Sequence, residues 1–130
     1  MYQIERKDYG YYLTFGDLIK ADEMNQWVKE SKQEMLSAPP QFGVFVDMRT
    51  LAPLPEDAQM AMQEGQKLYK AKGMTRSVVI VNSKITKMQF MRIAKETGIY
   101  EWERYIDATA VPNWEEVGVA WLTNAADPDL

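Results

Sequence analysis

The chain has 130 residues, of which 46% are hydrophobic and 26% are charged, as in one soluble globular domain. It contains no cysteine and no histidine. Their absence excludes disulfide scaffolds, Cys/His zinc sites, cysteine nucleophiles and triads that depend on histidine. The net charge of −4 argues against a general attraction to nucleic acid or anionic membranes, and leaves a local basic face open.

The N-terminal sequence MYQIERKDYG carries charges where a signal peptide needs an apolar run. No segment approaches the roughly 20 apolar residues of a transmembrane helix. We therefore expect a cytoplasmic protein without a membrane span.

The first third of the chain predicts a hairpin and a helix. Residues 2–6 and 11–15 are short aromatic and β-branched runs separated by KDYG, which is typical of an antiparallel β-hairpin. Within residues 21–36, Met24, Trp27 and Val28 begin an apolar stripe at helical spacing. The prolines that follow Ala38 end this helix.

The rest of the chain alternates strands with helices. The run GVFVDM is nearly continuous in apolar residues, which indicates a strand covered on both faces. In chain order the remaining predicted elements are a strand at 43–48, a loop at 49–54, a helix from Pro55 to Gly73, a strand at 77–81, a helix at 85–97 that closes at Gly98, a strand at 104–107 and a helix that opens at Pro112.

The element order is thus ββαβαβαβα, which predicts an α/β fold: a mixed β-sheet with about four packed α-helices. The parallel part of the sheet follows from the alternation, and the opening hairpin adds one antiparallel strand. We expect one domain over residues 1–123 and a polar, acidic tail over 124–130 that frays.

Two stretches resemble the STAS domain of the SpoIIAA-like superfamily, which holds the bacterial anti-anti-sigma factors and the small STAS/SEC14-like proteins. The segment VFVDMRTLAPLPEDAQMAMQEGQKLYKAKGM resembles the buried strand ending in Asp, the short loop and the helix closing at Gly. The segment SVVIVNSKITKMQFMRIAKETGIYEWERYID resembles the next strand, helix and last strand. The resemblance implies a SpoIIAA-like fold and a non-enzymatic regulatory role, whereas its SEC14 side implies an apolar ligand.

The regulatory motif of that family is missing from this sequence. Anti-anti-sigma proteins carry a serine, within an Asp-Ser-Ser/Thr-Gly-like signature, that a kinase phosphorylates at the start of the second helix. The corresponding positions here read Pro55-Glu56-Asp57-Ala58, with no hydroxyl. Glu56 and Asp57 either imitate a permanent phosphate charge or simply suit the positive end of a helix.

Asn82 and Ser83 follow a predicted strand just before the third helix. Ser83 is placed to cap that helix by accepting a hydrogen bond from a free backbone N–H. The same helix end could instead hold an anion beside Lys84 and Lys87. No Gly-rich phosphate loop supports a nucleotide site.

Met88 and Met91 lie off the apolar stripe of the third helix, since they are rotated by roughly 160° and 100° from Phe90. Methionine is common on adaptable binding surfaces. We expect a partner interface or a lipid-like ligand at this position, or a cover formed by a second helix or by the other subunit of a homodimer.

Three functions stay open at this level. The leading hypothesis is a non-enzymatic STAS-like module that binds a protein through the N-termini of the second and third helices. The alternative is a small carrier of an apolar, lipid-like ligand among methionines and aromatic side chains. The third is an enzyme that uses Asp47, Glu56 and Asp57 as metal ligands or as an acid/base pair. We expect no cofactor, no metal ion and no catalytic residue.

Overall fold

The computed structural model of the chain describes residues 1–130 as a five-stranded mixed sheet with four α-helices. Two short 3-10 helices, Met35–Ser37 and Tyr100–Trp102, follow α1 and α3. The bounds of the main elements are β1 Tyr2–Lys7, β2 Gly10–Asp17, α1 Ala21–Glu34, β3 Phe42–Leu51, α2 Glu56–Lys72, β4 Met74–Val81, α3 Lys84–Thr97, β5 Glu103–Asp107 and α4 Trp114–Asn124. The predicted order ββαβαβαβα is confirmed.

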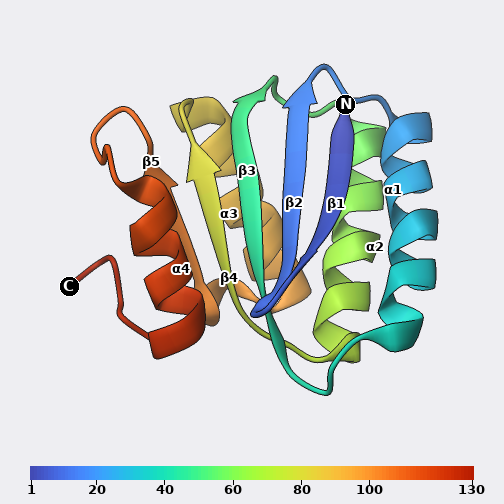
Figure 1. The fold of residues 1–130 in the computed structure, drawn as a ribbon. Helices are drawn as coiled ribbons and strands as arrows, with labels where there is room; N and C mark the ends of the chain where they lie inside the picture. The colour runs from blue at the N-terminus through green and yellow to red at the C-terminus, as the bar shows by residue number, and fades with distance from the viewer.

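The strands lie in the sheet in the same order as in the chain, β1-β2-β3-β4-β5. β1 and β2 form the predicted antiparallel hairpin, and β2 to β5 are parallel to one another. The carboxyl ends of the parallel strands therefore meet at one edge of the sheet, the upper edge in Figure 1, where all four α-helices begin. We call this the carboxyl edge.

The sheet is covered unequally on its two faces. Helices α1, α2 and α3 lie side by side behind the sheet, whereas α4 alone lies in front of it (Figure 1). Because the strand order advances in one direction, right-handed crossovers place the three connecting helices on the same face. A second apolar cluster lies between the front face of β3 to β5 and α4. The strands contribute Phe45, Val78, Ile80 and Ile106, and α4 contributes Trp121 and Leu122.

Close packing between α1 and α2 depends on Gly65. A β-carbon at this position would clash with the Trp27 ring, which is buried and stacks on Tyr69 with the ring centroids 5.6 Å apart. The helical stripe predicted from Trp27 and Val28 thus faces the main core. The absence of a side chain in α2 lets the largest residue of α1 fit between the helices.

The third strand is longer than the sequence predicts. Arg49 to Leu51 belong to β3 rather than to a loop, because β2 shifts its register after Thr14 and then pairs Gly16 with Thr50. Asp47 consequently lies within the strand and not at its end. In the sequence, the polar Asp47 after an apolar run indicates the end of a strand. In the structure the strand continues, and the Asp47 carboxylate binds the Arg49 side chain.

The C-terminal tail contacts the sheet through Asp127. Asn124 still belongs to α4, and Arg104 of β5 binds the Asp127 carboxylate through two hydrogen bonds of 2.9 and 3.0 Å. The same guanidinium lies over the Trp121 ring, 4.3 Å from its centroid. None of the helices is long and apolar enough to cross a membrane.

Candidate functional site

The predicted site residues of α2 and α3 lie at or near the carboxyl edge. Glu56 and Asp57 occupy the first turn of α2, and Asn82 and Ser83 immediately precede α3. The Ser83 hydroxyl accepts a hydrogen bond from the Thr86 N–H at 3.3 Å, which confirms the predicted cap. The Asp57 carboxylate accepts a hydrogen bond from the Ala58 N–H at the same kind of helix end.

The loop between β3 and α2 ties the two helices together. The Leu54 N–H donates a hydrogen bond to the Gln89 side-chain oxygen at 2.8 Å, and the Leu54 carbonyl accepts one from the Gln89 side-chain nitrogen at 3.2 Å. The same carbonyl also accepts from Gln59 of α2 at 2.9 Å. The Thr86 hydroxyl donates to the carbonyl of Leu51. These contacts hold the beginnings of α2 and α3 in one fixed arrangement.

Three large apolar side chains are exposed in the first two turns of α2 and α3. Met60 of α2 is 67% exposed, and Ile85 and Met88 of α3 are 63% and 69% exposed. A shallow hollow lies between the two helices, bounded by Gln59, Ile85, Met88, Gln89 and Arg92. Side-chain hydrogen bonds join Arg92 to Gln59 and Gln63 to Glu96 across the same junction. We call this region, from Glu56 to Glu64 and from Lys84 to Glu96, the α2–α3 surface.

The two methionines singled out by the sequence differ in their environment. Met88 points to solvent, whereas Met91 is half-buried. Both lie outside the buried stripe of α3, which consists of Thr86, Phe90, Ile93, Ala94 and Thr97. Helical spacing thus located the exposed side of α3, and Met88 is the residue that contributes most to it.

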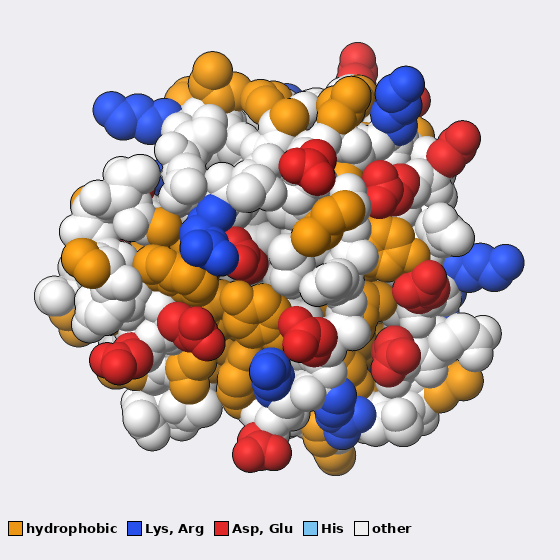
Figure 2. All heavy atoms as spheres, turned by 45° about the horizontal axis from the view of Figure 1, so that its top comes forward, with side chains coloured by type: hydrophobic (Ala, Val, Ile, Leu, Met, Phe, Trp, Pro, Cys, Tyr) orange, Lys and Arg blue, Asp and Glu red, His pale blue; other side chains and the backbone are white.

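Charged groups surround the carboxyl edge without forming a field of one sign. Figure 2, which turns this edge toward the viewer, shows orange apolar side chains among separate red and blue ones. On the α2–α3 surface acidic side chains predominate on α2, where Glu56, Asp57 and Glu64 are exposed. Basic side chains predominate on α3, where Lys84, Arg92 and Lys95 are exposed together with one acidic residue, Glu96. Such a surface suits a partner with both apolar and charged groups.

A second cluster, on the front face of the sheet, was not predicted. Asp47 accepts two hydrogen bonds of 3.0 Å from the Arg49 guanidinium and one of 3.4 Å from the Tyr12 hydroxyl. Arg49 also lies over the Trp114 ring of α4, 4.3 Å from its centroid. These residues are up to about a hundred positions apart in the chain, and no spacing rule connects them.

The electrostatics of this cluster indicate a structural role. The hydrogen bond to Asp47 raises the pKa of Arg49, and burial, followed by the Asp47 carboxylate, raises the pKa of Tyr12. A charged Asp47 is therefore paired with Arg49, and Tyr12 keeps its proton. The cluster attaches the beginning of α4 to β3 and leaves no free base for proton transfer.

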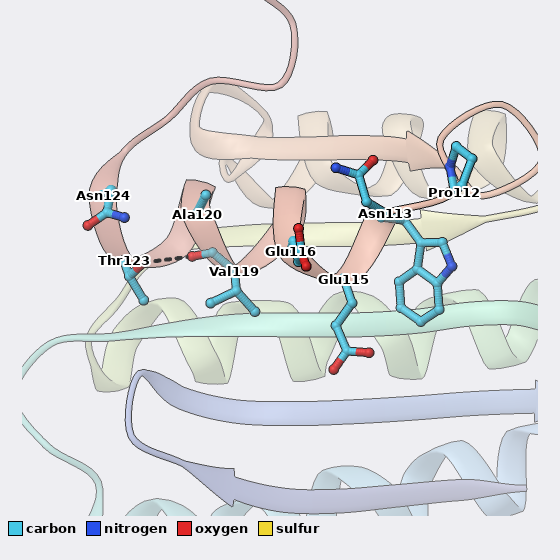
Figure 3. Close-up of a pocket in the computed structure, with 9 residues that line it drawn as sticks. Pro112, Asn113, Glu115, Glu116, Val119, Ala120, Thr123 and Asn124 are labelled. Atoms are coloured by element: carbon cyan, nitrogen blue, oxygen red, sulfur yellow. Dashed lines mark hydrogen bonds between the residues drawn. The ribbon is translucent and has the colours of Figure 1, made fainter.

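The outer side of α4 forms a broad hollow from Pro112 to Asn124 (Figure 3). Glu115 points from the helix toward the strands, and Thr123 bonds back to the carbonyl of Val119. The lining residues come from this one helix and the two residues that precede it. Because a ligand site needs polar groups that converge from several elements, we place no site there.

The main core contains a small cavity of about 30 Å³. Its lining is mostly apolar and includes Gln66, Ser77 and Glu103. Glu103 is buried, and its Oε2 accepts a hydrogen bond of 2.7 Å from Ser77, whereas its Oε1 has no partner. Burial raises the pKa of this carboxyl to about 7. A space of this size fits a water molecule and is far smaller than a lipid chain.

No protein family, curated protein or solved structure matches the chain. The structure also brings no three acidic side chains together into a group that could hold a metal ion. The α2–α3 surface is therefore the candidate site on its geometry alone: a rigid junction of two helices that exposes three large apolar side chains between opposite charges.

Proposed function

We propose that this chain is a non-enzymatic, STAS-like protein-binding or regulatory module that binds its partner through the α2–α3 surface. The observation that carries the proposal is the exposure of Met60, Ile85 and Met88 on one rigid junction. Clustered apolar side chains with a polar rim mark interaction sites on soluble proteins. The lack of cysteine agrees with a cytoplasmic location, which is part of this proposal.

The first turn of α2 supports a module that is always competent to bind. The resemblance to STAS domains puts the regulatory serine at this turn, and here Glu56 and Asp57 occupy it without a hydroxyl. Their carboxylates supply a negative charge that no kinase or phosphatase changes. The partner therefore meets a surface of constant charge. The amount bound then depends on the concentrations of the two proteins or on changes in the partner.

The other two hypotheses receive less support. A lipid carrier needs an enclosed apolar space, and the cavity in the main core measures about 30 Å³. An enzyme based on Asp47, Glu56 and Asp57 needs those carboxylates to act together. Instead Asp47 binds Arg49 and Tyr12, and Asp57 accepts from the backbone of its own helix.

Affinity capture from native lysate tests the proposal. The baits are the wild type, Met88→Glu, Glu56→Gln with Asp57→Asn, and the control Leu36→Glu. Leu36 is 77% exposed in the 3-10 helix after α1, outside the α2–α3 surface. Because Met88→Glu places a charge in an apolar contact, it should reduce recovery of the partner at least about tenfold, which corresponds to about 1.4 kcal/mol.

The control should recover the partner as well as the wild type does. Equal recovery of every captured protein by the wild type and Met88→Glu, measured by quantitative mass spectrometry, would overturn the proposal. Circular dichroism of each bait verifies that the exposed substitutions leave the fold intact.

A further inference from the structure

We propose that the partner of the α2–α3 surface is a second copy of this chain, with α2 of each copy packed against α3 of the other. The two-fold axis then runs parallel to the helices. This inference rests on the proposed function, because it names the occupant of the same surface. It goes beyond that function in fixing both the partner and the arrangement.

The apolar centre is suited to self-association. Met60 lies on the side of α2 opposite its buried residues, and Met88 does so on α3. A two-fold interface uses the same patch twice, so the exposed methionines of each copy are covered by α2 and α3 of the other. Methionine adapts its shape to an opposing surface better than branched residues do.

The charges decide between the two symmetric ways of joining the surfaces. With the axis parallel to the helices, α2 faces the partner's α3, and the acidic groups of α2 meet a helix on which basic groups outnumber the one acidic group, Glu96. With the axis perpendicular to the helices, α2 faces α2 and α3 faces α3. Like charges then oppose each other at both contacts, which disfavours that arrangement.

The contacts between α2 and α3 fix the relative positions of the charged side chains along the two helix axes, which we call their heights. Gln59 bonds to Arg92 and Gln63 bonds to Glu96, so residues of α3 lie level with residues 33 positions earlier in α2. Arg92 is therefore level with the stretch between Glu56 and Glu64, and Lys95 lies just above Glu64. Across the proposed axis Arg92 lies in height between Glu56 and Glu64, and Lys95 lies near Glu64. Glu96, level with Gln63, is the one acidic group on the basic side.

Most of these charges have no counter-ion within the single chain. Glu56, Lys84, Arg92 and Lys95 take part in none of the ion pairs of the structure. Glu64 has one contact, with Lys32 at a length of 3.9 Å between two exposed side chains. Such a pair contributes little, and Glu64 can turn toward a partner at small cost.

Sedimentation velocity over a concentration series from low micromolar to several hundred micromolar tests the association. We expect the wild type and Leu36→Glu to form a dimer as concentration rises. Met88→Glu should raise the dimer Kd at least about tenfold. A wild type that stays monomeric throughout the series overturns the inference.

Charge reversal tests the arrangement. Glu56→Lys with Glu64→Lys should weaken the dimer, and so should Arg92→Glu with Lys95→Glu. The chain that carries all four reversals should recover the wild-type Kd to within about threefold, because each helix again faces the opposite sign. If either pair of reversals leaves the Kd unchanged, α2 does not face α3 and the proposed arrangement is wrong.

Cross-linking locates the contact directly, because the natural chain has no cysteine to interfere. Chains with Met60→Cys and chains with Met88→Cys are treated with a short bis-maleimide, separately and as a mixture. The inference requires that the mixture cross-links several-fold more than either chain alone. Links between two Met60→Cys chains at equal or higher yield contradict it.

These results separate the inference from the proposed function. A monomeric wild type whose capture of a different protein depends on Met88 would overturn the self-association and retain the binding function. A monomer that captures nothing in a way that depends on Met88 would overturn both.

Discussion

Glu103 is a carboxyl group that folding removes from water. It begins β5, pairs with Ser77 of β4 in the sheet and lines the small cavity in the main core. One carboxyl oxygen accepts from Ser77 and the other has no partner. Since an unpaired buried charge is costly, the neutral acid is the form that this site favours up to a pH near the raised pKa of about 7.

This burial predicts that stability falls as pH rises. The pKa of Glu103 is about 7 in the folded chain and has its ordinary value of 4.5 when unfolded. Between these two values the folded chain binds more protons, so the free energy of unfolding decreases from about pH 4.5 to about pH 7. The loss should amount to about 3 kcal/mol when complete.

Glu103→Gln isolates the effect, because it keeps the size and removes the ionisation. Urea denaturation at pH 8 should show the variant to be more stable than the wild type by about 2 to 3 kcal/mol, with the two nearly equal at pH 4.5. Glu101→Gln, at an exposed position two residues earlier, serves as the control and should change neither value. A difference between Glu103→Gln and the wild type that does not vary with pH would exclude ionisation as the cause.

Individual residues were predictable where their role depends on near neighbours in the chain. Ser83 caps α3 because it stands three residues before the N–H that needs an acceptor. Glu103 gave no such signal: the sequence predicted the last strand from Arg104, with the glutamate outside it. Its burial depends on Ser77 and Gln66, which other elements bring to the same place.

At the scale of elements, the contact between α1 and α2 depends on a residue without a side chain. The Trp27 ring lies against Gly65 of α2 and occupies the space that a β-carbon on Gly65 would fill. Replacing glycine by alanine in a helix ordinarily stabilises it by about 1 kcal/mol. Here the ring would have to move out of a close-packed core, which costs more than the helix gains.

We therefore expect Gly65→Ala to destabilise the fold by about 1 to 3 kcal/mol in chemical denaturation. Lys67→Ala, on the exposed side of the same helix, is the control and should stay within about 0.5 kcal/mol of the wild type. A Gly65→Ala protein more stable than the wild type would show that Trp27 can repack freely.

The elements themselves were predictable because periodicity is local. The stripes of α1, α2 and α3 and the apolar runs of β3 and β4 each fit within a few turns or one strand. The end of β3 was not predictable, since Thr50 pairs with Gly16 after a register shift in β2. The attachment of α4 through Arg49 and Trp114 likewise joins distant segments.

At the scale of the whole molecule, self-association predicts a melting temperature that depends on concentration. A partner that binds only the folded chain stabilises it by mass action. The Tm of the wild type should therefore rise over a hundredfold increase in protein concentration, whereas the Tm of Met88→Glu should rise less over the same range. Calorimetry at several concentrations measures this, and a constant Tm in the wild type would argue against association through the folded surface.

The strand order of the sheet also affects how the molecule is made. Every strand pairs with the strand that precedes it in the chain, so no strand has to wait for a later one to be inserted beside it. During synthesis from the N-terminus, the hairpin and then each following strand and helix can add to a sheet that already exists. Only α4 arrives last on the other face, and until then the front of β3 to β5 stays apolar and uncovered. The interval before α4 is complete is thus when the nascent chain most needs protection from aggregation.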